Sequence, residues 1–308
     1  MKKSYILPLL FLITAMLPNF GFGQTMLTLS KRMKLSIDEI NRFVDSARYS
    51  SEFIDSVTGK TKYYYPDGNY EDSLENESLE LSNYLKAYLP LISRSLKDTV
   101  DVPKIHIASY SDGKVYEIPQ LGIASSHDKK MRIWTWDTWT GGSMPFYCNI
   151  VEYSTPHGIK VVDLEHDLGW GPKDRGANNW FDTIFSVTGD SNKTYYLARS
   201  TWKADVGTYG TGIYAFTIED TILNTCPGIF KENESGLSDG GSFRCDIDAS
   251  EYDCPPPKIK MNSKGDKLHI QHIAYKKDKK GYNRGYLTSK WKVYDFNGRY
   301  FHYIGIKK

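Results

Sequence analysis

The spacing of apolar residues changes near residue 103, and this change divides the chain into a helical section and a β section. Apolar residues at 37–48 recur at helical spacing behind a capping box formed by Ser36 and Glu39. A second helical pattern begins near Ser73, and Pro90 should kink that helix or split it in two. Because two short helices bury little apolar surface alone, we expect both to pack on the β section.

Beyond residue 103, short β-branched and aromatic runs alternate with turn residues, as is typical of an antiparallel meander. The predicted strands are 104–109, 114–118, 131–137, 145–153, 158–163, 183–188, 194–200, 211–219, 267–275, 286–296 and 299–306. Asn297-Gly298 favours a two-residue hairpin turn, which predicts that Tyr294 pairs with Phe301. Aromatic residues fall on both sides of this hairpin, so we expect both of its faces to be covered. The predicted fold is mainly β with N-terminal helices, an antiparallel and sandwich-like meander.

A short internal echo suggests an alternative to the sandwich. Residues 107–109 and 123–125 share the tripeptide Ile-Ala-Ser, and each copy is followed by an aspartate and a lysine. The second copy continues into Met131–Asp137, which resembles the end of a WD-type propeller blade. A true array would repeat every forty or so residues, and no such repeat is found. A small β-propeller is the alternative fold.

The N-terminus carries the features of a signal peptide. Two lysines precede an apolar run from Tyr5 to Met16, which is too short to span a membrane as a helix. Gly21 and Gly23 suit a signal peptidase that would leave Gln24 as the first mature residue. We therefore expect an exported protein, periplasmic or extracellular, that is soluble after cleavage and has no membrane span. The predicted sections are a signal peptide at 1–23, a helical N-terminal section at 24–100 and an antiparallel β domain at 101–308.

The overall composition and charge are those of an ordinary globular protein. The formal net charge of the whole chain is only +2, so nucleic acid is not an expected partner. The aromatic content is high at 14%, with 23 Tyr, and aromatic residues suit both strand surfaces and binding surfaces.

The four cysteines fit the oxidising compartment that an exported protein would enter. Cys226, Cys245 and Cys254 cluster in a stretch rich in glycine, serine and aspartate, so we expect one disulfide among them. Cys148 alternates with apolar residues of a predicted strand, which is typical of a buried thiol. The cysteines lack the paired spacing of a zinc ribbon.

The candidate catalytic residues are Asp163, Glu165, His166 and Asp167, which follow a predicted strand. Loop carboxylates beside an aromatic residue can separate into a general acid and a general base, which predicts a secreted hydrolase. The alternative is a solvated turn in which Arg175 pairs with one of the acids.

Two groups of residues are candidate metal ligands. An acidic loop could bind a hard cation such as calcium, although it lacks the spacing of the helix-loop-helix motif. Its carboxylates are Asp246, Asp248, Glu251 and Asp253. His269 and His272 lie three apart in a predicted strand and point to opposite faces, so they should not bind one ion together. No cofactor is predicted, with calcium as the alternative.

Tryptophans form the candidate binding surface. Trp134 and Trp136 lie on one side of a predicted strand, Trp139 follows in the next turn, and Trp170 follows the acidic segment. Exposed, they would form a platform for a glycan or protein ligand; the alternative is that Trp134 and Trp136 belong to the core. We therefore expect a non-catalytic binding module, with the hydrolase at 163–167 as the alternative.

Overall fold

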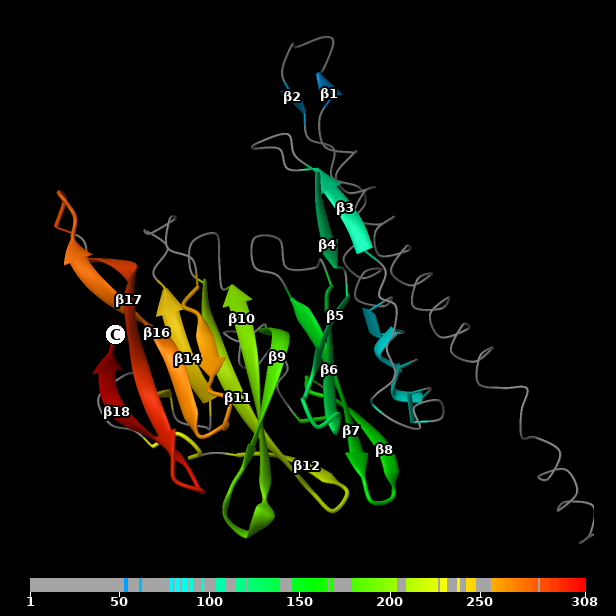
Figure 1. Ribbon diagram of the computed structural model, residues 1–308. Helices are drawn as coiled ribbons and strands as arrows, with labels where there is room; N and C mark the ends of the chain where they lie inside the picture. Colours follow the sequence, from blue (N-terminus) through cyan, green and yellow to red (C-terminus); the bar gives the residue numbers. More distant parts are fainter. Residues whose placement is uncertain are drawn as a thin grey trace, which may run out of the picture.

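In the part that the structure describes, the chain is mainly β, with three four-stranded antiparallel meanders and one short α-helix (Figure 1). The computed structural model describes residues 121–138, 146–165, 167–168, 179–203, 209–226, 228–231, 256–281 and 283–308, with shorter stretches before and between them. The predicted signal peptide and the helix predicted at 37–48 lie outside the described residues. None of the helices in the described part is long and apolar enough to cross a membrane.

The three meanders follow one another along the chain, and each has its strands in sequential order. The first sheet contains β5 (Leu121–Ser125), β6 (Met131–Asp137), β7 (Tyr147–Thr155) and β8 (Gly158–Asp163). The middle sheet contains β9 (Asn179–Thr188), β10 (Thr194–Lys203), β11 (Tyr209–Glu219) and β12 (Ile222–Thr225). The terminal sheet contains β15 (Ile259–Met261), β16 (Lys267–Lys277), β17 (Asn283–Phe296) and β18 (Phe301–Lys307).

Smaller strands extend or precede these sheets. The middle sheet is extended by β14 (Ser242–Ile247), which pairs with the first half of β11, and then by β13 (Leu237–Ser238). Two separate hairpins precede the first sheet: β1 (Phe53–Ile54) with β2 (Thr61–Lys62), and β3 (Lys104–Ala108) with β4 (Val115–Pro119). The first of these lies inside the section that was predicted to be helical.

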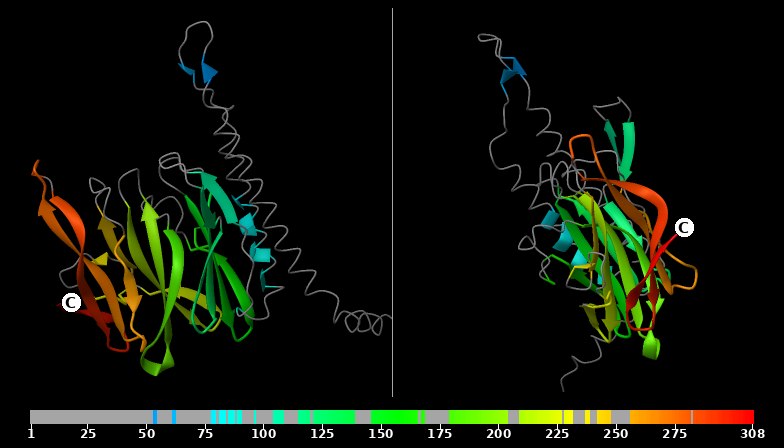
Figure 2. Two further views of the ribbon diagram at one scale, coloured as in Figure 1. Left: turned by 45° about the horizontal axis from the view of Figure 1, so that its top comes forward. Right: turned by 90° about the vertical axis from the view of Figure 1, so that its left-hand side faces the viewer.

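The sheets are stacked in layers, with the middle sheet covered on both faces (Figure 1 and Figure 2). One apolar cluster joins the first sheet to the middle sheet, with Ile133 and Val151 facing Phe181 and Phe216. A second cluster joins the opposite face of the middle sheet to the terminal sheet, and it includes Tyr294. Burying apolar surface on both faces of one sheet supplies much of the favourable free energy of folding.

The helix forms a further layer on the outer face of the first sheet. The described helical residues lie between positions 78 and 90. Leu81, Leu85 and Leu89 recur at helical spacing and pack against Trp134 and Trp136. This confirms the prediction that the second helix packs on the β section.

The first hairpins of the three sheets have turns of the same length with one shared backbone feature, although the second turn also has a positive φ of 58° at Ser191. Each turn has five residues, at 126–130, 189–193 and 262–266. The fourth residue has a positive φ in all three: 57° at Lys129, 59° at Asn192 and 74° at Gly265. In the first and third turns, the side chain of the opening residue accepts hydrogen bonds from the same two backbone N–H groups, four and five residues later. The three sheets are therefore built on one local plan.

The terminal hairpin differs from the prediction in its register. Phe296 pairs with Phe301, and Tyr294 pairs with Tyr303 rather than with Phe301. The loop has four residues because the Asn297 side chain accepts hydrogen bonds from the backbone N–H groups of Arg299 and Tyr300. The pairing is shifted by two residues relative to the prediction. An even shift leaves each side chain on the predicted face of the hairpin as far as the bulge next to Val293.

The wider loop also contacts the first turn of the middle sheet. The backbone N–H of Asp190 donates to the carbonyl of Gly298 at 2.7 Å, and the Asp190 carboxylate pairs with Arg299 at 2.8 Å. Gly298 has a φ of 97°, and a Cβ there would collide with that carboxylate. The loop that makes this long-range contact has four residues and not the two that were predicted.

Candidate functional site

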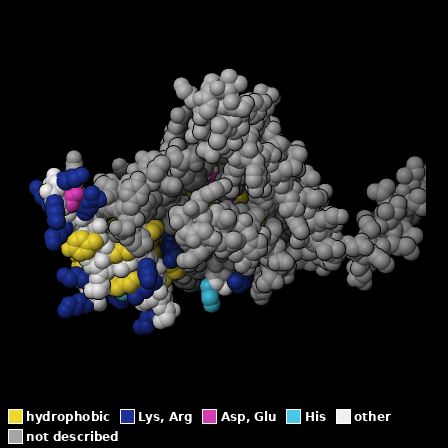
Figure 3. Space-filling model, turned by 90° about the horizontal axis from the view of Figure 1, so that it is seen from above, with side chains coloured by type: hydrophobic (Ala, Val, Ile, Leu, Met, Phe, Trp, Pro, Cys, Tyr) yellow, Lys and Arg dark blue, Asp and Glu magenta, His cyan; other side chains and the backbone are white. Residues whose placement is uncertain are grey.

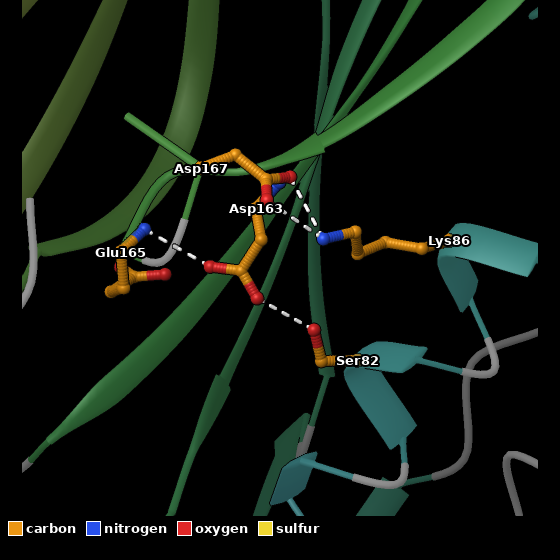
Figure 4. Close-up of polar contacts among 5 residues, drawn as sticks. All are labelled: Ser82, Lys86, Asp163, Glu165 and Asp167. Atoms are coloured by element: carbon orange, nitrogen blue, oxygen red, sulfur yellow. Dashed lines mark hydrogen bonds and ion pairs between the residues drawn. The ribbon is translucent and has the colours of Figure 1, made fainter. Parts of the chain in front are cut away.

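The acidic segment after β8 forms a turn that holds the helix on the first sheet (Figure 4). The hydroxyl of Ser82 donates to Asp163 Oδ2 at 2.6 Å, and Lys86 pairs with Asp167 at 2.8 Å. Asp163 is buried, whereas Lys86 and Asp167 are about one third exposed. Two carboxylates of the predicted catalytic set thus contact successive turns of the helix.

Backbone N–H groups of the same turn donate hydrogen bonds to its carboxylates. The N–H of Glu165 donates to Asp163 Oδ1 at 3.0 Å, and the N–H of Asp163 donates to Asp167 Oδ2 at 2.9 Å. Both Asp163 oxygens therefore accept hydrogen bonds from the protein. Such carboxylates are held in one geometry, which suits a structural anchor.

Glu165 is the most perturbed carboxyl of this turn. One of its oxygens accepts from the backbone N–H of Asn149 at 2.9 Å and the other from the Asn149 side-chain amide at 2.8 Å. The Asn149 amide oxygen in turn accepts from the buried hydroxyl of Thr135 at 2.7 Å. Burial raises the pKa of Glu165 to about 8, and the nearby Asp163 charge adds to that effect.

The geometry of the acidic turn limits what it can do chemically. Glu165 has a pKa suited to a general acid, but its two oxygens face Asn149 on the neighbouring strand. Asp163 and Asp167 are bonded to the helix and the turn. The fourth candidate, His166, lies outside the described residues, as does Arg175.

Trp134 and Trp136 are buried, with 0% and 1% of their surface exposed. Both lie under the helix, and Trp134 Nε1 donates to Glu152 at 3.2 Å. Glu152 also pairs with Arg132, whose guanidinium donates to the carbonyl of Leu96. In this arrangement the two indoles are packing residues, and the exposed platform expected from the sequence is not formed by them. Trp139 and Trp170 lie outside the described residues.

The cysteine prediction is not supported where the structure describes it. Cys226 carries a free thiol, half-buried at the end of β12, and burial raises its pKa. Cys245 lies on β14 opposite Thr211 with its side chain undescribed, and Cys254 is outside the described residues. No disulfide occurs among the cysteines that the structure describes. Cys148 is half-buried beside the apolar cluster under the helix, close to the buried thiol that was predicted.

The proposed metal ligands give no site within the described residues. No group of three His, Cys, Asp or Glu side chains there could hold an ion. The backbone of Asp246 lies on β14 opposite Gly210, and its side chain is undescribed. Asp248, Glu251 and Asp253 lie outside the described residues. The two histidines have different neighbours, since His269 is near Lys260 whereas His272 is near Lys290 and Lys292.

The strongest chemical signal is the charge of the terminal sheet, which the net charge of the chain conceals. Residues 258–308 contain 14 Lys and Arg but only three Asp and no Glu, a formal net charge of +11. The first 257 residues contain 25 basic and 34 acidic residues, a formal net charge of −9. The last sheet thus concentrates positive charge at one end of the stack.

The three acids of this sheet are already engaged. Asp295 pairs with Lys267 at 2.8 Å and Asp278 pairs with Arg284 at 3.0 Å. Asp266 accepts a hydrogen bond from its neighbour in the first turn, the amide of Asn262, at 2.6 Å. The basic groups of the sheet therefore far outnumber its carboxylates, and their field extends into solvent.

The basic face is the side of the terminal sheet turned away from the middle sheet. Its basic and aromatic side chains are Lys258, Lys260, Lys267, His269, Trp291 and Lys307, and Gln271, Val293 and Asp295 lie on the same face. Lys260 Nζ lies 4.0 Å from the centre of the Trp291 ring, and the His269 ring packs against the same indole at 6.4 Å. Burial lowers the pKa of His269, and Lys260, Lys267 and Lys307 lower it further. Three lysines from three strands therefore converge around a half-exposed aromatic pair.

Basic side chains are also found at the tip of the long β16–β17 hairpin. Tyr275 and Tyr286 are 60% and 49% exposed near this end. Exposed lysines surround them, at positions 276, 277, 279 and 280. Seen from above, basic side chains gather around aromatic and apolar ones at the end of the molecule formed by the terminal sheet (Figure 3).

Comparisons of the chain with protein-family models, with curated proteins and with solved structures found no match. The basic face was missed at the sequence level because only the net charge of the whole chain was considered. A count over the last 51 residues would have found it.

Proposed function

We propose that the protein is an exported, non-catalytic binding module and that its ligand surface is the basic face of the terminal sheet. The observation that carries this proposal is the separation of charge, +11 in residues 258–308 against −9 in the rest of the chain. A rigid sheet that presents lysines and aromatic rings to solvent is suited to binding, because its groups are already ordered before the ligand arrives. The proposed ligand surface is therefore this basic face and not the platform of tryptophans that was expected from the sequence.

A secreted hydrolase that uses the acidic turn is the second candidate. Its support is the pKa of Glu165, which burial raises to about 8, within the range of a general acid at neutral pH. Against it stand the contacts of Asp163 and Asp167 with the helix. If Glu165 is the general acid of a hydrolase, the Glu165→Gln variant should have no hydrolytic activity. A hydrolytic activity that Glu165→Gln leaves unchanged would exclude the acidic turn as the catalytic site.

We also infer that the three sheets are successive blades of an open, propeller-like array. Their sequential strand order, their shared five-residue first turn and their face-to-face packing support this architecture over a two-layer sandwich. In such an array only the outermost blades leave a face uncovered. The terminal sheet is one of these, which explains why the ligand surface would lie there.

Export is part of this proposal and has its own test. Expression of the full chain in a bacterial host with a general secretion pathway should release mature protein that begins at Gln24. N-terminal sequencing or mass spectrometry of the secreted fraction identifies the cut. Retention of Met1 in an intracellular product would contradict export.

The binding proposal is tested with an array of immobilised glycans and charged polymers. The parent protein is compared with Lys260→Glu combined with Lys307→Glu on the basic face. The matched control is Lys160→Glu, an exposed lysine on the edge strand of the first sheet. At least one ligand should be bound by the parent and the control and lost by the double variant. Equal binding by all three proteins would exclude the basic face.

A further inference from the structure

We infer that the ligand of the basic face is an acidic polysaccharide, a chain of sugars that carry carboxylate or sulfate groups. This inference rests on the proposed binding function of the same face and names its ligand class. The first support is charge complementarity, since the face and hairpin tip belong to a segment with a net charge of +11. A ligand that carries many negative charges gains most from such a field.

The spread of the lysines favours a polymer over a small anion. Lys260 lies on β15 and Lys307 on β18, at opposite edges of the four-stranded sheet. Neighbouring strands are about 4.8 Å apart, so the backbones of these two residues are separated by roughly 14 Å. One small oxyanion would contact only the lysine tips that meet at one point, whereas an extended chain with a charge on each residue can contact lysines along the whole face.

The aromatic residues favour sugars over other polyanions. The half-exposed Trp291 ring lies among the lysines of the face, and two exposed tyrosines lie on opposite faces of the hairpin tip, because Tyr275 pairs with Gly285 and Tyr286 pairs with Ala274. Aromatic rings present apolar faces on which sugar rings pack, and tyrosine hydroxyls add hydrogen bonds. A surface with charges alone would give an ionic attraction without this second contribution.

Two other polyanions are less well matched. Insertion into an anionic membrane uses a continuous apolar face of aromatic and aliphatic side chains beside the basic ones. The exposed large apolar residues described on this sheet are two tyrosines and Ile306. Nucleic acid would be attracted by the same field, but the predicted export places the protein where surface polysaccharides are the common polyanions.

The experiment measures binding in solution at low and high salt for four probes. The probes are polygalacturonate, heparin, a short DNA duplex and phosphatidylglycerol vesicles, with neutral dextran as a blank. The parent should bind the two acidic polysaccharides more tightly than the duplex or the vesicles, and more weakly at high salt. Lys260→Glu with Lys307→Glu should weaken this binding by about tenfold, because two attractions become repulsions. Lys160→Glu should bind as the parent does.

Trp291→Ala separates sugar packing from ionic attraction. It should weaken polysaccharide binding by about threefold and leave its salt dependence unchanged, because a ring contact is removed and no charge. Equal binding by parent and Trp291→Ala would overturn the sugar-packing argument. If the double variant loses binding but the duplex or the vesicles are preferred, the ligand class is wrong and the binding function stands. If no probe distinguishes the double variant from Lys160→Glu, both proposals fail.

Discussion

The first and terminal sheets have the same strand order and the same kind of first turn, yet their outer faces differ in character. The outer face of the first sheet is apolar and covered by the helix, with Trp134 and Trp136 buried beneath leucines. The outer face of the terminal sheet carries lysines around the half-exposed Trp291. The same arrangement of strands thus carries an apolar face covered by a helix in the first sheet and a basic face in the terminal sheet. The residues on the outer face make this difference.

An aromatic residue on a strand indicates core or surface only together with the side chains around it. Trp134 has a buried ion pair beside it and a helix above it, and its N–H is satisfied by Glu152. Trp291 has a lysine over its ring and another lysine across from it on β18. Lysine side chains keep their charge in water, so an indole among them stays near the surface.

The largest expected effect is that of Trp134→Ala. The substitution leaves a cavity under the helix and removes the hydrogen bond to buried Glu152, so the free energy of unfolding should fall by about 3–5 kcal/mol. Urea unfolding followed by circular dichroism measures the change. Trp291→Ala is the matched control and should cost less than about 1 kcal/mol, since its ring is half-exposed. Equal losses for the two variants would contradict the contrast between the two faces.

The next effect is the pH dependence that Glu165 gives to the first sheet. Burial raises its pKa in the folded state to about 8 from an ordinary value of 4.5, so the folded chain binds that proton more tightly than the unfolded chain. This contribution to stability is complete below pH 4.5 and is lost as the pH rises through about 8. The loss should reach at most about 4 kcal/mol at alkaline pH.

Glu165→Gln provides the comparison for this pH effect. Glutamine does not titrate, so the variant should lose the part of the pH dependence between about 5 and 9 that the carboxyl contributes. Urea unfolding of parent and variant across this range measures the two slopes. Identical slopes would show that Glu165 is ionised at little cost in the folded protein.

The smallest effects concern the two polar contacts of the helix. Ser82→Ala leaves the buried Asp163 carboxylate with one donor fewer and should lower the free energy of unfolding by about 1–3 kcal/mol. Lys86→Ala removes an ion pair that is about one third exposed, and its effect should be below about 1 kcal/mol. Thermal unfolding of both variants shows which of the two contacts contributes more to stability. A larger loss for Lys86→Ala would mean that the exposed pair anchors the helix.

Much of the strand pattern could be predicted from alternation alone. The bounds of β6 and β8 are those predicted, because both strands have strong β formers and clear turn residues on either side. The strands that were missed are β1, β2, β5, β12, β13, β14 and β15, which have two to six residues each. Such short runs hold too few residues for their periodicity to stand out. The repeat of three sheets was hidden because their first strands begin at unequal intervals, at Leu121, Asn179 and Ile259.

The candidate site was harder to predict than the strands. The acidic turn was found as a cluster, but its role as an anchor depends on Ser82 and Lys86, which are 81 positions earlier in the chain. The loop of the last hairpin also contacts Asp190, more than a hundred positions away. Local patterns carry no information about such partners, because they arise only when separate layers meet.

The amino-acid sequence by itself determined the β character of the chain beyond residue 103 and the positive charge of its last 51 residues. These depend on side-chain alternation, turn chemistry and composition, which act over a few neighbouring residues. Only the tertiary structure decided that the helix covers two tryptophans and that Lys260 and Lys307 share an open face. Burial and exposure are properties of how whole layers pack, so they follow from contacts between distant segments.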